Sequence, residues 1–143
     1  MEKSIELRLL KQAERIAEMY KLDVTSEKHE ELCSAIKACY EYVEDDKGDW
    51  WDLYEIVQGD DGLWNYEIDK SLSRYEQDMW GISVCILSCI CLIGCIKEHD
   101  SVPQDLEIVE ENIPKLVEFM ENSYKSKEDN EKFNEFWRSE MCY

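Results

Sequence analysis

Four cysteines lie close together in one apolar run of this 143-residue chain, and thiolates are the side chains that most readily bind zinc or form disulfides. The run extends from Met79 to Ile96 and contains no charged residue. Its cysteines are Cys85, Cys89, Cys91 and Cys95. On one helix, at about 100° per residue, these side chains spread over roughly 160° and cannot surround one ion. There is no CxxC pair, and both histidines lie in charged stretches, so we expect no metal and no cofactor.

A disulfide framework also fits poorly, because the chain has an odd number of cysteines, seven, at irregular spacings. The first twenty residues carry charges throughout and lack the apolar block of a signal peptide. We therefore expect a cytoplasmic protein, in which thiols stay reduced. Free cysteines of this kind usually pack as small apolar side chains in the core.

A membrane span is the alternative interpretation of the Met79 to Ile96 run, because a helix of about 18 residues reaches roughly 27 Å. Acidic residues flank the run on both sides, and Lys and Arg show no asymmetry between the two flanks. The amphipathic helices predicted elsewhere also need an apolar partner. We therefore expect a buried central helix over about residues 75–99.

Apolar residues recur at helical spacing in the first 44 residues and predict two amphipathic helices. The first pattern consists of Ile5, Leu9, Ala13, Ile16 and Tyr20. The second consists of Leu32, Ile36, Cys39 and Val43. Asp49 is a plausible N-cap for a short helix that carries Trp50, Tyr54 and Val57.

Two further helices are predicted after the apolar run. Asn112 can cap one of them, with Pro114 in its first turn. "SKED" at 126–129 matches a capping box that precedes another. No stretch alternates convincingly between apolar and polar residues. We predict a single all-α domain over residues 1–143, a compact multi-helix bundle around the buried central helix.

The charge of the chain limits its partners. Asp and Glu number 34 against 16 Lys and Arg, which gives a net charge of −18 at pH 7. The electrostatic field of a protein with this net charge repels nucleic acid and anionic membranes and attracts basic proteins. We therefore expect a basic protein partner, no nucleic acid and no membrane.

No sequence motif indicates catalysis. HExxH, GxGxxG and the Walker loop do not occur, and the two histidines offer little for acid-base chemistry. "GDDG" and "EDDKGD" do not place oxygen ligands at the positions that a calcium loop requires. Acidic turns explain both better. A carboxylate pair acting as acid and base stays open, because carboxylates are so numerous, but we expect no enzyme.

Residues 41–69 combine acidic and aromatic side chains in an unusual density. Eleven acidic residues, one lysine and six aromatic residues occur there. Binding hot spots are rich in Trp and Tyr, and surrounding charges steer the encounter with a partner, so the segment is typical of a docking surface for a basic protein. The alternative, in which the rings belong to the core and the acids are merely solvated, stays open. The expected contact residues are Asp45, Asp46, Asp49, Trp50, Asp52, Tyr54, Asp60, Asp61, Trp64 and Tyr66.

The same region resembles the sixth immunity-protein family of bacterial polymorphic toxin systems. The motifs that carry the resemblance are "ACYEYVED", then "DWWDLYEIV", then Trp80 at the head of the apolar helix, then "SVPQDLEIVEE". Together they cover roughly residues 30 to 115. The resemblance implies a small cytoplasmic antidote that binds and blocks the toxin encoded beside it. It supplies no catalytic residue. We expect a monomer or weak dimer.

A nucleic-acid mimic is the alternative function. A charge of −18 on a compact helical body can imitate phosphate spacing and so inhibit a DNA-binding or restriction protein. A toxin that is itself a basic nuclease would suit the same charge. The identity of the toxin and the mode of blocking do not follow from the sequence.

Overall fold

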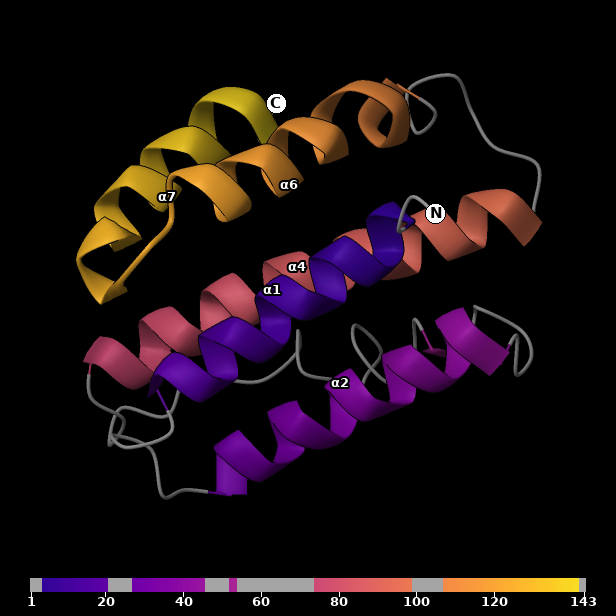
Figure 1. Ribbon diagram of the computed structural model, residues 1–143, viewed down its shortest axis with the longest axis horizontal. Helices are drawn as coiled ribbons and strands as arrows, with labels where there is room; N and C mark the ends of the chain where they lie inside the picture. The colour runs from indigo at the N-terminus through magenta and orange to yellow at the C-terminus, as the bar shows by residue number, and fades with distance from the viewer. Residues whose placement is uncertain (1–3, 21–26, 46–51, 54–73, 99–106, 142–143) are drawn as a thin grey trace.

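The computed structural model describes residues 4–20, 27–45, 52–53, 74–98 and 107–141 (Figure 1). Its longer helices are α1 (Ile5–Tyr20), α2 (Glu27–Asp45), α4 (Arg74–Glu98), α6 (Ile113–Asn122) and α7 (Asn130–Phe136). Single turns, η1 (Ile108–Asn112), η2 (Lys127–Asp129) and η3 (Trp137–Met141), precede or extend the last two. No strand occurs in these ranges, and the predicted all-α fold is confirmed.

The helices form three layers (Figure 1). α1 and α4 lie together in the middle, α2 lies on one side of them, and α6 with α7 lies on the other. α1 contacts α2, α4 and α6, and α4 also contacts α2. The predicted central helix therefore shares the middle of the molecule with the N-terminal helix.

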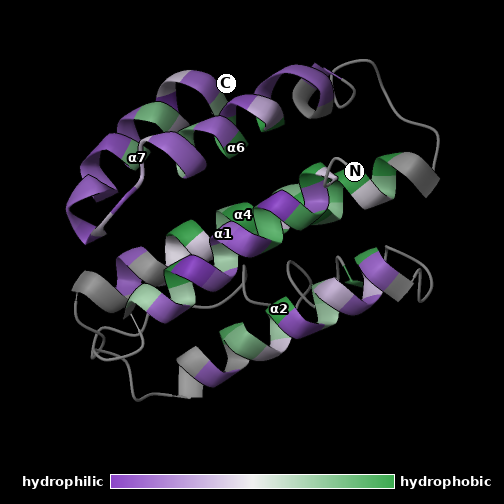
Figure 2. Cartoon of the chain, in the orientation of Figure 1, coloured by the Kyte–Doolittle hydropathy of each residue, from purple (hydrophilic) through white to green (hydrophobic). Residues whose placement is uncertain are grey.

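α4 is the apolar helix that the sequence predicts over about residues 75–99, and its buried position is confirmed. Ile86, Leu87, Ile90 and Cys91 are fully buried along it. Burial of one Leu or Ile side chain stabilises a fold by about 1.5–3 kcal/mol. Hydrophobic residues extend along most of α4, whereas the outer turns of the α6–α7 pair are largely hydrophilic (Figure 2). No helix in the described ranges combines the length and apolarity that crossing a bilayer requires.

The amphipathic helices bury one face each, as their spacing predicts. α1 buries Leu9, Leu10, Ala13, Ile16 and Ala17. α2 buries Leu32, Ala35, Ile36 and Cys39. α6 buries Ile113, Leu116, Val117 and Met120. The opposite faces carry the charged side chains, so the net negative charge lies at the surface.

The turn between α6 and α7 begins with the capping box that the sequence predicts. The backbone N–H of Glu128 donates to Ser126 Oγ at 3.3 Å, and the backbone N–H of Ser126 donates to Asp129 Oδ2 at 3.1 Å. α6 and α7 then pack through aromatic rings, with Phe119 stacked on Phe136 at a centroid distance of 4.7 Å. This pairing holds α7 and η3 beside α6.

Asn112 does not cap α6, and that prediction is wrong. Its backbone is helical, with φ −82° and ψ −43°, and its side chain makes no capping hydrogen bond. The chain is already helical through η1, whereas an N-cap needs an extended backbone. The buried Asn112 amide instead donates from Nδ2 to the backbone oxygen of Glu140 at 2.9 Å. Pro114 does lie in the first turn of α6, as predicted.

Candidate functional site

The structure places two of the ten expected contact residues. Asp45 is the last residue of α2, and Asp52 is exposed to solvent. Leu53, beside Asp52, is fully buried and belongs to the hydrophobic core. The short helix predicted after Asp49 is otherwise outside the described residues. So are the remaining eight contact residues, Asp46, Asp49, Trp50, Tyr54, Asp60, Asp61, Trp64 and Tyr66.

Carboxylates lie beside two titratable side chains on the face that α1 and α2 share. Burial, a hydrogen bond to Glu14 and the charges of Glu14 and Glu44 raise the pKa of Tyr40 to about 12. Partial desolvation and nearby carboxylates also raise the pKa of the exposed Cys33 thiol above its usual value. A nearby carboxylate disfavours the anionic form of a tyrosine or cysteine side chain and so raises its pKa. Lys11, Arg15 and Lys37 line the same face, so its charge is mixed.

The cysteines of α4 behave as core residues. Cys89 and Cys91 are buried, and Cys85 and Cys95 are partly buried. Burial, with a smaller contribution from Cys85, raises the pKa of Cys89 to about 12. Thiols in this state are protonated at neutral pH and are poor nucleophiles and metal ligands. Among the described residues, no group of three or more His, Cys, Asp or Glu side chains could hold a metal ion.

Sequence reasoning missed a thiol pair in the core. Cys39 of α2 hydrogen-bonds to Cys91 of α4, and this contact together with burial raises the pKa of Cys91. The two residues lie far apart in the sequence, so no spacing rule could reveal the pair. The contact joins α2 to the middle layer.

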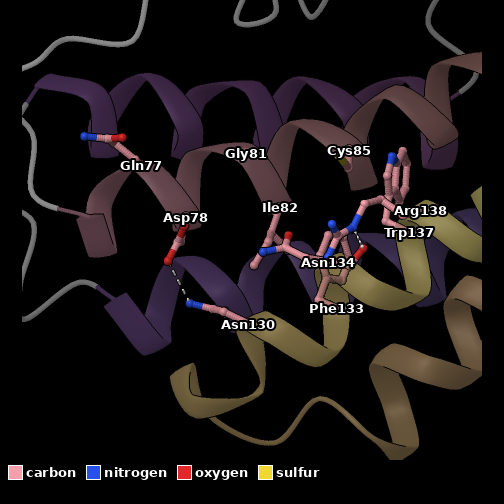
Figure 3. A pocket seen from close by; sticks show the side chains of 10 residues that line it. All are labelled: Gln77, Asp78, Gly81, Ile82, Cys85, Asn130, Phe133, Asn134, Trp137 and Arg138. Carbon is pink, nitrogen blue, oxygen red and sulfur yellow. Dashed lines mark hydrogen bonds between the residues drawn. The ribbon is translucent and has the colours of Figure 1, made fainter. Parts of the chain in front are cut away.

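Sequence reasoning also missed a groove between α4 and the α7–η3 segment (Figure 3). It encloses about 510 Å³. Ile82 and Phe133 lie between Asp78 and Asn130 at one end and Trp137 and Arg138 at the other (Figure 3). Gly81 and Cys85 of α4 also line it. The one local sign of the groove was Gly81, a residue without a side chain inside an apolar helix.

Hydrogen bonds fix the polar end of the groove. Asn130 Nδ2 donates to Asp78 Oδ2 at 3.3 Å and so connects α7 to α4. The buried Tyr124 hydroxyl donates to Asn130 Oδ1. At the other end, Arg138 Nε donates to the backbone oxygen of Asn134 at 3.3 Å. An apolar floor between a carboxylate and a guanidinium suits recognition of another molecule's side chains.

Comparison with known proteins identifies a family. A family model described as "Immunity protein Imm6" matches residues 7–136. The matched region begins in α1 and ends at the last residue of α7, so it covers all or nearly all of each longer helix that the structure describes. No curated protein and no solved structure matches the chain significantly.

Proposed function

The chain belongs to the Imm6 family of immunity proteins, and we propose that it neutralises a cognate toxin by binding the toxin domain directly and stoichiometrically. The observation that carries this proposal is the family match over residues 7–136. An immunity protein acts against a toxin, and the resemblance recognised in the sequence is therefore confirmed at the level of the family. The match also favours immunity over nucleic-acid mimicry.

The proposed toxin domain is basic, and a nuclease is the class that suits this protein best. Nucleases bind a polyanion and so present cationic surfaces. The net charge of −18 attracts such a surface and accelerates the encounter. We place this interaction in the cytoplasm of the cell that makes the toxin, with the immunity protein acting as a monomer or weak dimer.

The proposed docking surface is the acidic and aromatic segment of residues 41–69. Its described residues support this placement, because Asp52 is exposed while the adjacent Leu53 is fully buried. Leu53 anchors the segment to the core, and Asp52 contributes to the field outside it. Acids would supply the long-range attraction, and one or two exposed rings would supply the anchors.

Co-expression tests the proposal. The C-terminal toxin domain encoded beside this gene is expressed in a host cell with and without the immunity protein. We expect restored growth and a co-purifying complex of nanomolar or tighter affinity, which corresponds to about −12 kcal/mol or beyond. Rescue without any complex would instead indicate an antidote that modifies the toxin or repairs its damage. Absence of rescue and of binding would contradict the proposal.

A further inference from the structure

We propose that the groove between α4 and the α7–η3 segment is a second anchor site for the toxin, a proposal that rests on the proposed function. Its occupant is an apolar side chain of the toxin domain next to a lysine or arginine. The apolar side chain lies on Ile82 and Phe133, and the cation pairs with Asp78. This site adds a recessed anchor to the acidic segment of residues 41–69.

The shape of the groove suits an inserted side chain. Its volume, about 510 Å³, lies within the range of sites that hold small ligands. Ile82 and Phe133 are 4% and 3% exposed, so they form an apolar floor that is packed into the core. Trp137 remains only partly buried, and the energetic centres of protein interfaces are often apolar pockets of this kind.

Gly81 opens one wall of the groove. A Cβ atom added there would meet no heavy atom within 4 Å, and the backbone does not have a positive φ. Neither packing nor conformation therefore requires glycine at this exposed position. Glycine inside a helix is destabilising relative to alanine. The bare backbone allows close approach by a partner, which is a use that explains this residue.

Asp78 supplies the charge complementarity. Its carboxylate is partly buried and accepts a hydrogen bond from the neutral amide of Asn130. Within the described part of the chain it has no ion-pair partner. Arg138, the cation that also lines the groove, lies at the far end and donates Nε to its own helix. A basic toxin can therefore supply a cation for the Asp78 carboxylate.

The groove also lies within reach of the proposed docking segment. α4 begins at Arg74, five residues after Asp69, and five residues span at most about 18 Å when fully extended. Asp78 and Gly81 lie in the first turns of α4. A toxin bound to the end of the segment can thus contact the groove at the same time.

The first test fills the groove. Gly81→Trp places a ring in it, whereas the matched control Ser34→Trp adds the same ring to an exposed position of α2. The probe is the toxin domain encoded beside the gene, and binding kinetics are measured on folded protein. We expect Gly81→Trp to weaken affinity about 30-fold, or ~2 kcal/mol, mainly through faster dissociation. The Ser34→Trp variant should bind as the wild type does.

The second test removes the charge without the bulk. Asp78→Asn keeps an oxygen that can accept the Asn130 hydrogen bond, so the fold is preserved. We expect about tenfold weaker binding and a smaller dependence of affinity on salt, because one ion pair is lost. If Gly81→Trp does not fold, the binding affinity of Asp78→Asn alone tests whether the toxin uses the groove.

The outcomes separate the two proposals. If the wild type binds the toxin and both folded groove variants bind with wild-type affinity, the groove is not an anchor, although the proposed function stands. If the wild type does not bind the toxin, the proposed function itself fails. If Gly81→Trp only abolishes self-association of the immunity protein, a second copy of this chain occupies the groove, and the toxin anchor is overturned.

Discussion

Asn130 of α7 donates a 3.3 Å hydrogen bond to Asp78 of α4, and its amide oxygen accepts another from the buried Tyr124 hydroxyl. One side chain therefore connects the end of α6, the start of α7 and the middle layer. The hydrogen bond to Asp78 helps to position α7, because few other described polar contacts join α7 to α4. It also sets the polar end of the groove.

Replacement of Asn130 by Ala should destabilise the fold by about 1–3 kcal/mol, because a buried hydrogen-bond partner is lost. Urea unfolding measures the change. Asn134→Ala on the exposed face of the same helix is the control and should have little effect. In the double variant with Tyr124→Phe, the loss should be smaller than the sum of the two single losses. Strictly additive losses would contradict the coupling.

The Arg8–Glu121 ion pair between α1 and α6 should make stability depend on acid pH. Arg8 holds the pKa of Glu121 below its ordinary value of 4.5, against an opposing effect of burial. The stabilisation is therefore complete above about pH 4.5 and is lost as the pH falls through the lower pKa of the folded state.

Glu121→Gln should remove this part of the acid dependence, at a cost of no more than about 1 kcal/mol at neutral pH, because the pair is partly exposed. Urea titrations at a series of pH values measure the slope. Glu118→Gln, on the exposed face of the same helix, is the control. An unchanged slope in Glu121→Gln would show that the pair does not act in solution.

The described cysteines should differ in their reaction with iodoacetamide at pH 8. Cys33 is exposed and should react first, although its raised pKa slows it. Cys39, Cys89 and Cys91 are buried and should react only when the protein opens. Mass spectrometry of peptides gives the order. Rapid native labelling of Cys91 would contradict its place in the core.

Reversal of acids in the docking segment should act on association with the toxin. Changing Asp45, Asp46, Asp60 and Asp61 to Lys should slow association and flatten its salt dependence, because rim charges act on the encounter. Dissociation should change less. Stopped-flow or surface-based kinetics at two ionic strengths make the measurement. A wild-type association rate in the reversed variant would place the docking surface elsewhere.

Trp64→Ala should instead speed dissociation and weaken binding by about 2 kcal/mol or more, because an anchor ring is removed. Thermal unfolding of the free variant is the necessary control. If the variant unfolds, Trp64 belongs to the core and not to the interface. A folded variant with the wild-type dissociation rate would exclude Trp64 as an anchor.

The sequence predicts the helical body well, because periodicity and local capping determine most of it. The apolar run of α4 lacks a polar face, and that composition alone indicates a helix surrounded by others. The cap at Asn112 could not be excluded locally, because its amide binds Glu140, 28 residues away. The groove depends on how α7 packs against α4, which the local sequence does not determine. Only Gly81, a glycine that neither packing nor conformation requires, indicated the groove in the sequence. In the acidic segment, the sequence could not tell that Leu53 is core while Asp52 is exposed.

The place of α1 in the middle layer has a consequence for synthesis of the protein. Arg15 of α1 donates from Nη2 to the backbone oxygens of Met120 and Tyr124, each at 2.6 Å, and so caps a helix made 105 residues later. At typical translation rates that interval lasts roughly 5–20 s. During it, the hydrogen bonds from Arg15 to Met120 and Tyr124 cannot form, so α1 completes its contacts only after α6 has been made. The contact between α1 and α6 therefore closes only after most of the chain has been made.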